Sequence, residues 1–191
     1  MPELLNDLIS GDETRAEEAV SLLVDLGEEA IPALLDLTHS SDADQRWWGL
    51  RVLAQSPSGT SRKSEWLVPF LSDPAREVRQ CAALGLAASP DEGAIEPLIR
   101  VLSDEDSMVS NLALNALVKI GSAAVPSLLE VVKNAPQSAR IHALRALAEI
   151  RDHRAIPVMM QVMGEDSALL QHWAKEGLER LGLNMVYIKP V

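Results

Sequence analysis

Few residues in this 191-residue chain are of the types, or at the spacings, that chemistry requires. The four histidines (His39, His142, His153, His172) form no HExxH motif and no pair at zinc-ligand spacing. Neither a glycine-rich phosphate loop nor a GxSxG nucleophile motif is present. The single cysteine, Cys81, stands among small residues, where free cysteine is usually inert core packing. These observations predict no catalytic residues, no metal and no cofactor, and they favour a non-enzymatic protein.

Two adjacent tryptophans are the chemically distinctive feature. Trp47 and Trp48 lie beside Arg46 and Arg51 in DQRWWGLRVLA, in a chain with four tryptophans, one tyrosine and one phenylalanine. Neighbouring residues on a helix point about 100° apart, so both rings cannot fill one core position. The helices that carry them decide which ring packs and which is available to a ligand.

A repeat of about thirty residues organises the chain. Small residues recur 30 to 33 positions apart, each in a stretch with apolar residues at helical spacing, which predicts a long amphipathic helix. A shorter helix with a proline in or near its first turn follows each long one. The small residues let neighbouring helices approach closely. They are Ala19, Gly49, Ala82, Ala113, Ala143 and Ala174.

The repeat resembles the short HEAT-like type known from phycobilisome lyases, most fully in REVRQCAALGL at 76–86. The resemblance implies an all-α fold: an α-solenoid with a right-handed superhelix of about six HEAT-like helix pairs. We expect a single domain over 1–182, with units at about 1–27, 28–55, 61–88, 91–121, 122–150 and 152–182. The loop at 56–62 interrupts the second pair, and 183–191 form a tail that either caps the last repeat or lies extended.

The resemblance also implies a ladder of Asp–Arg pairs between neighbouring repeats. The arginine recurs as Arg46, Arg79 and Arg140, and the other copies carry Ala16, Ser110 and Gln171. Asp73 and Asp104 are the expected acidic partners, with Asp42 or Asp44 as a further candidate. A ladder with half its arginines replaced is partial.

Alignment on the small residues separates the two tryptophans. Trp48 falls in a mostly apolar column and is expected to pack, while Trp47 falls in a mostly polar one. We expect Trp47, with Arg51 four residues on, to belong to a binding stripe on the concave face, since Trp and Arg are enriched at interface hot spots. In the alternative interpretation, Trp47 covers an apolar patch near the 56–62 loop or Trp66. The full stripe is Trp47, Arg51, Gln80, Asn111, Asn115 and Arg145.

The charge distribution narrows the choice of partner. The net charge is −11, and residues 1–44 hold twelve acidic residues and one basic residue. That distribution disfavours nucleic acid, because phosphate binding draws its affinity from basic residues. No apolar run approaches a membrane span, no secretory signal is visible, and one cysteine excludes an internal disulfide, so we expect no membrane association and a cytoplasmic location.

The sequence leaves three functions open. The leading hypothesis is a non-enzymatic scaffold that binds a protein or peptide on its concave face. The alternative, implied by the resemblance, is a bilin lyase or isomerase-type subunit that binds a tetrapyrrole and a phycobiliprotein, with Trp47, Arg51 and Arg145 against rings and propionates. A third resembles the HEAT-like DNA glycosylases, and the acidic first quarter disfavours it.

Overall fold

The computed structural model describes residues 1–57 and 63–183. These residues contain helices and no strand, which confirms the all-α class and the helix pairs expected from the repeat. By its internal contacts the chain divides into two compact units, Met1–Ala94 and Ile95–Val191. Most of the expected 56–62 loop and of the 183–191 tail lies outside the described residues.

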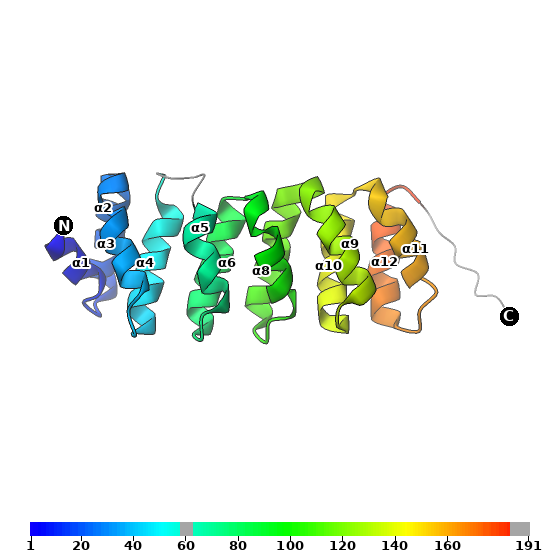
Figure 1. Cartoon of the computed structure of the whole chain (residues 1–191), viewed down its shortest axis with the longest axis horizontal. Helices are drawn as coiled ribbons and strands as arrows, with labels where there is room; N and C mark the ends of the chain where they lie inside the picture. Colours follow the sequence, from blue (N-terminus) through cyan, green and yellow to red (C-terminus); the bar gives the residue numbers. More distant parts are fainter. Residues whose placement is uncertain (58–62, 184–191) are drawn as a thin grey trace. The chain divides into compact units, whose positions relative to one another are not determined.

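In unit 1 (Met1–Ala94) each short helix packs against the long helix that follows it (Figure 1). The three pairs are α1 (Pro2–Leu8) with α2 (Glu13–Leu26), α3 (Ile31–Thr38) with α4 (Ala43–Gln55), and α5 (Lys63–Leu67) with α6 (Arg76–Ala88). Short 3₁₀ turns at Gly27–Glu29, Val68–Ser72 and Glu92–Ala94 connect these elements.

Unit 2 (Ile95–Val191) repeats the arrangement. Its pairs are α7 (Ile95–Arg100) with α8 (Ser107–Ile120), α9 (Val125–Asn134) with α10 (Gln137–Ile150), and α11 (Ile156–Val162) with α12 (Ala168–Arg180). The 3₁₀ turns are Val101–Ser103, Gly121–Ala124 and His153–Ala155.

Side chains at the helix ends explain where the long helices begin and stop. Asp12 accepts hydrogen bonds from the Thr14 and Arg15 amides at 3.0 and 3.2 Å, which satisfies two free donors at the start of α2. Gly121 ends α8 with φ +78°, a left-handed conformation that glycine adopts at no steric cost. At the end of α10 (Gln137–Ile150) the corresponding residue is Arg151, which takes φ +57°.

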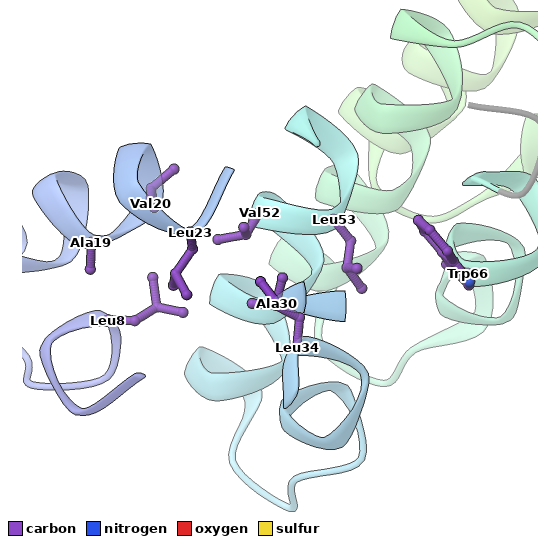
Figure 2. Close-up of a cluster of buried hydrophobic side chains, with 9 residues drawn as sticks. All are labelled: Leu8, Ala19, Val20, Leu23, Ala30, Leu34, Val52, Leu53 and Trp66. Carbon is purple, nitrogen blue, oxygen red and sulfur yellow. The ribbon is translucent and has the colours of Figure 1, made fainter. Parts of the chain in front are cut away.

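The core forms where the long helices meet the short ones. Figure 2 shows the buried cluster of unit 1, with Leu8 from α1, Leu23 from α2, Leu34 from α3 and Trp66 from α5 brought together. The small-residue column is buried throughout, and a Cβ added to Gly49 would lie 3.0 Å from the Leu34 carbonyl oxygen. Close helix approach is therefore the structural reason for the repeat's small residues.

One stretch corrects the expectation that no apolar run approaches a membrane span. Ser107–Asn134 is long and apolar enough by length and composition to cross a membrane. It folds, however, as two helices of 14 and 10 residues, α8 and α9, on either side of the turn at Gly121–Ala124. Each is shorter than the roughly 20 residues that a membrane-spanning helix needs.

Candidate functional site

A hollow of about 540 Å³ lies among α2, α4 and α6 in unit 1. Three residues of the predicted binding stripe, Trp47, Arg51 and Gln80, contribute to its wall. Trp47 and Trp48, both in α4, supply the aromatic part of that wall. We call this feature the Trp47 hollow.

The two tryptophans occupy different surroundings although both are half-buried. Trp48 packs against the core cluster that contains Trp66, and Trp47 is not among the side chains packed there. Their rings meet edge to face, with centroids 4.7 Å apart and planes at 80°. Both also line the Trp47 hollow, since Trp48 is only partly buried by the core cluster.

Arg51 is held in place by aromatic faces and a carboxylate. Its guanidinium carbon lies 5.1 Å from the Trp47 ring centroid and 5.3 Å from that of Trp48. Its two terminal nitrogens pair with the Glu17 carboxylate oxygens at 2.8 and 2.9 Å. This two-pronged pair compensates the charge of Arg51 within the chain.

Acidic residues surround the tryptophans. Asp12, Glu13, Asp44 and Glu77 line the Trp47 hollow, and Arg51 is the cation in its lining among the described residues. Glu77 also pairs with Arg76 at 2.8 Å. The repeat pattern assigned none of these acids to the binding stripe, and Asp44 was a candidate only for the Asp–Arg ladder, although the sequence does place two of them at equivalent positions. Asp44 and Glu77 stand five positions before the small residues of their repeats.

Unit 2 holds the other three stripe residues. Arg145 lies over the Trp173 ring at 5.1 Å, and its Nη1 donates to Asn111 Oδ1 at 3.0 Å. Asn111 in turn donates to the Ser107 carbonyl at 2.6 Å, whereas Asn115 is exposed. Arg145 and Asn111 are 34 residues apart in the sequence, as are Arg51 and Glu17. The arginine at this repeat position therefore contacts the equivalent residue of the preceding repeat in both units.

The histidine beside this second pair is close to a cation. Burial lowers the pKa of His142, and the charge of Arg145 lowers it further, against hydrogen bonds to backbone groups that raise it. The Arg145 environment therefore favours neutral or anionic groups nearby.

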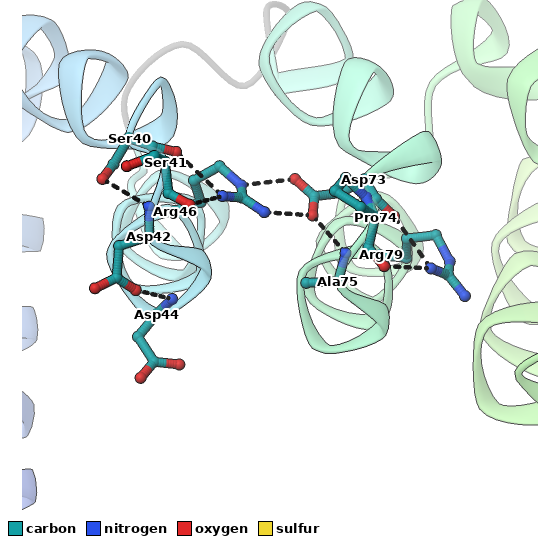
Figure 3. A network of polar contacts seen from close by, with 9 residues as sticks. All are labelled: Ser40, Ser41, Asp42, Asp44, Arg46, Asp73, Pro74, Ala75 and Arg79. Carbon is teal, nitrogen blue, oxygen red and sulfur yellow. Dashed lines mark hydrogen bonds and ion pairs between the residues drawn. The ribbon is translucent and has the colours of Figure 1, made fainter.

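The arginines of the predicted ladder make three kinds of contact. Figure 3 shows Arg46 donating through Nε and Nη2 to the Asp73 carboxylate, both at 2.8 Å, while Nη1 donates to the Ser40 and Ser41 carbonyls. Arg79 donates to the backbone carbonyl of Asp73 at 3.0 Å. Burial raises the pKa of Asp73, but the bonds from Arg46 and the Ala75 amide, with the charges of Arg46 and Arg79, bring it below its usual value.

In unit 2 the corresponding arginine pairs with a glutamate. Arg140 donates to Glu165 at 2.5 Å and to the Val132 carbonyl at 2.6 Å. Asp104 accepts a hydrogen bond from the Asp106 amide, which lies at the start of α8. Glu165 comes 25 residues after Arg140, whereas Asp73 comes 27 residues after Arg46. An alignment that assumes equal spacing in every repeat therefore does not identify Glu165 as the acceptor.

The described residues contain no group of three or more histidine, cysteine or acidic side chains placed to hold a metal. Cys81 is buried in α6, and burial raises the pKa of its thiol to about 12, although the charge of Arg51 acts in the opposite direction. A thiol with such a pKa stays protonated at neutral pH and is a poor nucleophile.

Two models of repeat families match parts of the chain. The HEAT repeats family matches residues 64–139, and the PBS lyase HEAT-like repeat family matches residues 139–165. With the helix pairs, these matches define the class of a HEAT-like repeat protein. Within that class, the match at residues 139–165 confirms the resemblance to the short PBS lyase HEAT-like type seen in the sequence.

Among the curated relatives that match the chain is a phycocyanobilin lyase subunit. Over 88 residues the chain is 40% identical to the phycocyanobilin lyase subunit beta of Pseudanabaena tenuis, covering 46% of this chain and 31% of that protein. The curated relatives are matched over 31% to 49% of their own length.

Two solved structures share the fold. The archaeal HEAT-like repeats protein of Thermococcus onnurineus is 16% identical with a TM-score of 0.67, covering 100% of this chain and 83% of its own. A chain of the complex of CpcE and CpcF of phycocyanin lyase from Nostoc is 24% identical with a TM-score of 0.58, covering 76% and 96%.

Proposed function

We propose that the chain is a subunit of a bilin lyase-type assembly, binding a bilin and working together with a protein partner. The observation that carries this proposal is the 40% identity to a phycocyanobilin lyase subunit beta. This identity supports the bilin lyase alternative better than a scaffold with no small ligand. That relative is named as one subunit of a lyase, so we expect lyase activity only together with a protein partner.

Arg145 and Trp173 are the bilin contact that the charges favour. A bilin is a conjugated tetrapyrrole with two propionates, and it calls for a flat aromatic surface beside an uncompensated cation. Trp173 supplies the ring, and Arg145 faces the neutral amide of Asn111. Arg51, the other arginine that the sequence offered for this role, is already paired with Glu17 and lies in an acidic hollow.

The test is a titration of the purified chain with phycocyanobilin, followed by visible absorbance and circular dichroism. We expect an induced dichroism band for the wild-type protein and a severalfold weaker affinity for Arg145→Gln. Arg51→Gln is the matched control, since it removes the same charge from the same repeat position, and it should bind like the wild type.

Far-ultraviolet circular dichroism of each variant shows whether its helices remain intact. An unchanged bilin spectrum with the wild-type chain, alone and with its co-purified partner, would contradict the proposal. Equal losses in both arginine variants would contradict the assignment to Arg145.

A further inference from the structure

The Trp47 hollow lies apart from the contact assigned to the bilin, and its charge is opposite to what a propionate requires. We propose that it binds an arginine side chain of the protein partner. This inference relies on the proposed function only for the existence of such a partner, and it adds the chemistry by which unit 1 recognises it.

Charge is the first observation. Unit 1 contains 17 acidic and seven basic residues, whereas residues 95–191 contain 11 and ten, so nearly all of the chain's net charge of −11 belongs to unit 1. Four carboxylates line the Trp47 hollow, and the cation in its described lining, Arg51, is already compensated by Glu17. One of the four, Glu77, also pairs with Arg76. A cationic group entering the hollow meets a favourable field, and an anion is repelled.

The second observation is that the chain already fills one such position itself. Arg51 is stacked on Trp47 and Trp48 and held by both oxygens of Glu17. Aromatic face and carboxylate together are the two contacts that a planar guanidinium makes best. Trp47 with Asp44, three residues before it on α4, offers the same combination to a second guanidinium.

The third observation is the shape of the site. The Trp47 hollow is an open concavity of about 540 Å³ with tryptophan in its wall and Asp12, Glu13, Asp44 and Glu77 exposed around it. An apolar wall with acidic groups at the rim suits the long methylene stem and charged end of arginine. A second copy of this chain fits poorly, because two acidic first units repel each other.

The experiment uses the full chain and a short acetylated and amidated peptide, Gly-Ser-Arg-Gly-Arg-Ser-Gly, titrated by isothermal calorimetry at low salt. The matched peptide carries citrulline at both arginine positions, which keeps the shape and removes the charge. We expect measurable binding of the arginine peptide, none of the citrulline peptide, and weaker binding of the lysine version, which cannot form the two-pronged pair.

Two variants locate the binding. Asp44→Asn and Trp47→Leu should each weaken the arginine peptide by about fivefold, because each removes one of the two contacts. Asp25→Asn takes the same charge from α2 outside the Trp47 hollow and should change the affinity by less than about twofold. Sedimentation of the chain alone, with a single monomer boundary expected, tests the second-copy alternative.

Equal weakening by Asp44→Asn and Asp25→Asn would show attraction to unit 1 in general and overturn the proposed site. Equal binding of the citrulline peptide would overturn the chemistry, and a concentration-dependent dimer broken by Trp47→Leu would make a second copy the occupant. The phycocyanobilin titration uses a different ligand and the Arg145 variant, so either proposal can fail while the other stands.

Discussion

At the scale of single residues, arginines at the same repeat position differ in whether a neighbouring side chain compensates their charge. Arg51 and Arg145 both stand two residues after the small residue of their helix and both reach back 34 residues. Glu17 neutralises the first, and Asn111 leaves the charge of the second uncompensated. The side chain that each arginine contacts, more than the arginine itself, decides whether its positive charge is compensated within the chain.

The Arg46–Asp73 pair leads to a stability prediction. Both side chains are largely buried, at 12% and 5% exposure, so removing one charge strands the other in a poorly solvated place. We expect Asp73→Asn to lower the free energy of unfolding by about 3 kcal/mol, measured by urea denaturation. Glu165→Gln, from the more exposed Arg140 pair at 19% and 33%, should cost clearly less.

The pH dependence of the same pair has a definite sign. The pKa of Asp73 is lower in the folded chain than its ordinary value of 3.8, so the unfolded state binds more protons in that range. The stabilisation is complete above about pH 4 and is lost as the pH falls through the folded pKa. Asp73→Asn should make the free energy of unfolding depend less on pH below about pH 4. An unchanged dependence, measured by urea denaturation at several pH values, would show that other carboxylates cause it.

At the scale of helices, glycine sets how closely neighbouring elements approach. A Cβ on Gly85 would lie 2.8 Å from Leu67 Cδ1 and 2.9 Å from the Cβ of Ala54 in α4. The Ala54 Cβ cannot rotate away, so α4 and α6 would have to separate. On Gly177 the new atom would meet Met159 Cε at 2.5 Å, which is the free end of a flexible side chain.

Gly85→Ala and Gly177→Ala therefore form a matched pair. We expect Gly85→Ala to destabilise the chain by about 1–2 kcal/mol, because overpacking outweighs the gain in helix propensity. Gly177→Ala should be near neutral or slightly stabilising, since Met159 can repack. Thermal melts followed at 222 nm measure both, and equal losses would mean that the Met159 site is as rigid as Ala54.

The sequence predicts elements better than their contacts. Small residues about thirty apart and prolines before each long helix were enough for the helix pairs, because the repeat presents the same pattern several times. The short helix near Pro69 differs from the expected pattern, in which the proline lies in or near the first turn of the helix. Here α5 ends at Leu67, and Pro69 lies in the first turn of a separate 3₁₀ helix, Val68–Ser72. Proline fixes its own backbone angle, but which helix type follows depends on packing.

The candidate site was predictable only in part, for a physical reason. Columns of the repeat grouped Trp47, Arg51 and Gln80 in one predicted stripe, and these three residues line the Trp47 hollow. Pairings such as Arg51–Glu17 and Arg140–Glu165 depend on side chains that extend several ångströms and on loops that shift the register. A repeat alignment contains no such distances, so it showed the arginines but not their acceptors.

For the whole molecule, the division of charge has a thermodynamic consequence. Unit 1 carries 17 acidic and seven basic residues, so its folded form accumulates like charge that the expanded chain can separate, whereas residues 95–191 are nearly balanced. Asp25 and Asp36 add to this cost, since each lies near the negative C-terminal end of its helix, α2 or α3.

Salt should therefore stabilise the two units unequally. Raising sodium chloride from about 0.01 to about 0.15 M shortens the screening length from roughly 30 to roughly 8 Å, which weakens repulsion across unit 1. We expect backbone amides of residues 1–94 to exchange hydrogen more slowly at the higher salt, with little change beyond, as measured by mass spectrometry of peptides. The double variant Asp25→Asn, Asp36→Asn should be better protected at low salt and respond less to its increase. An equal response in both units, or faster exchange of unit 1 at higher salt, would show that favourable ion pairs outweigh the repulsion that its composition implies.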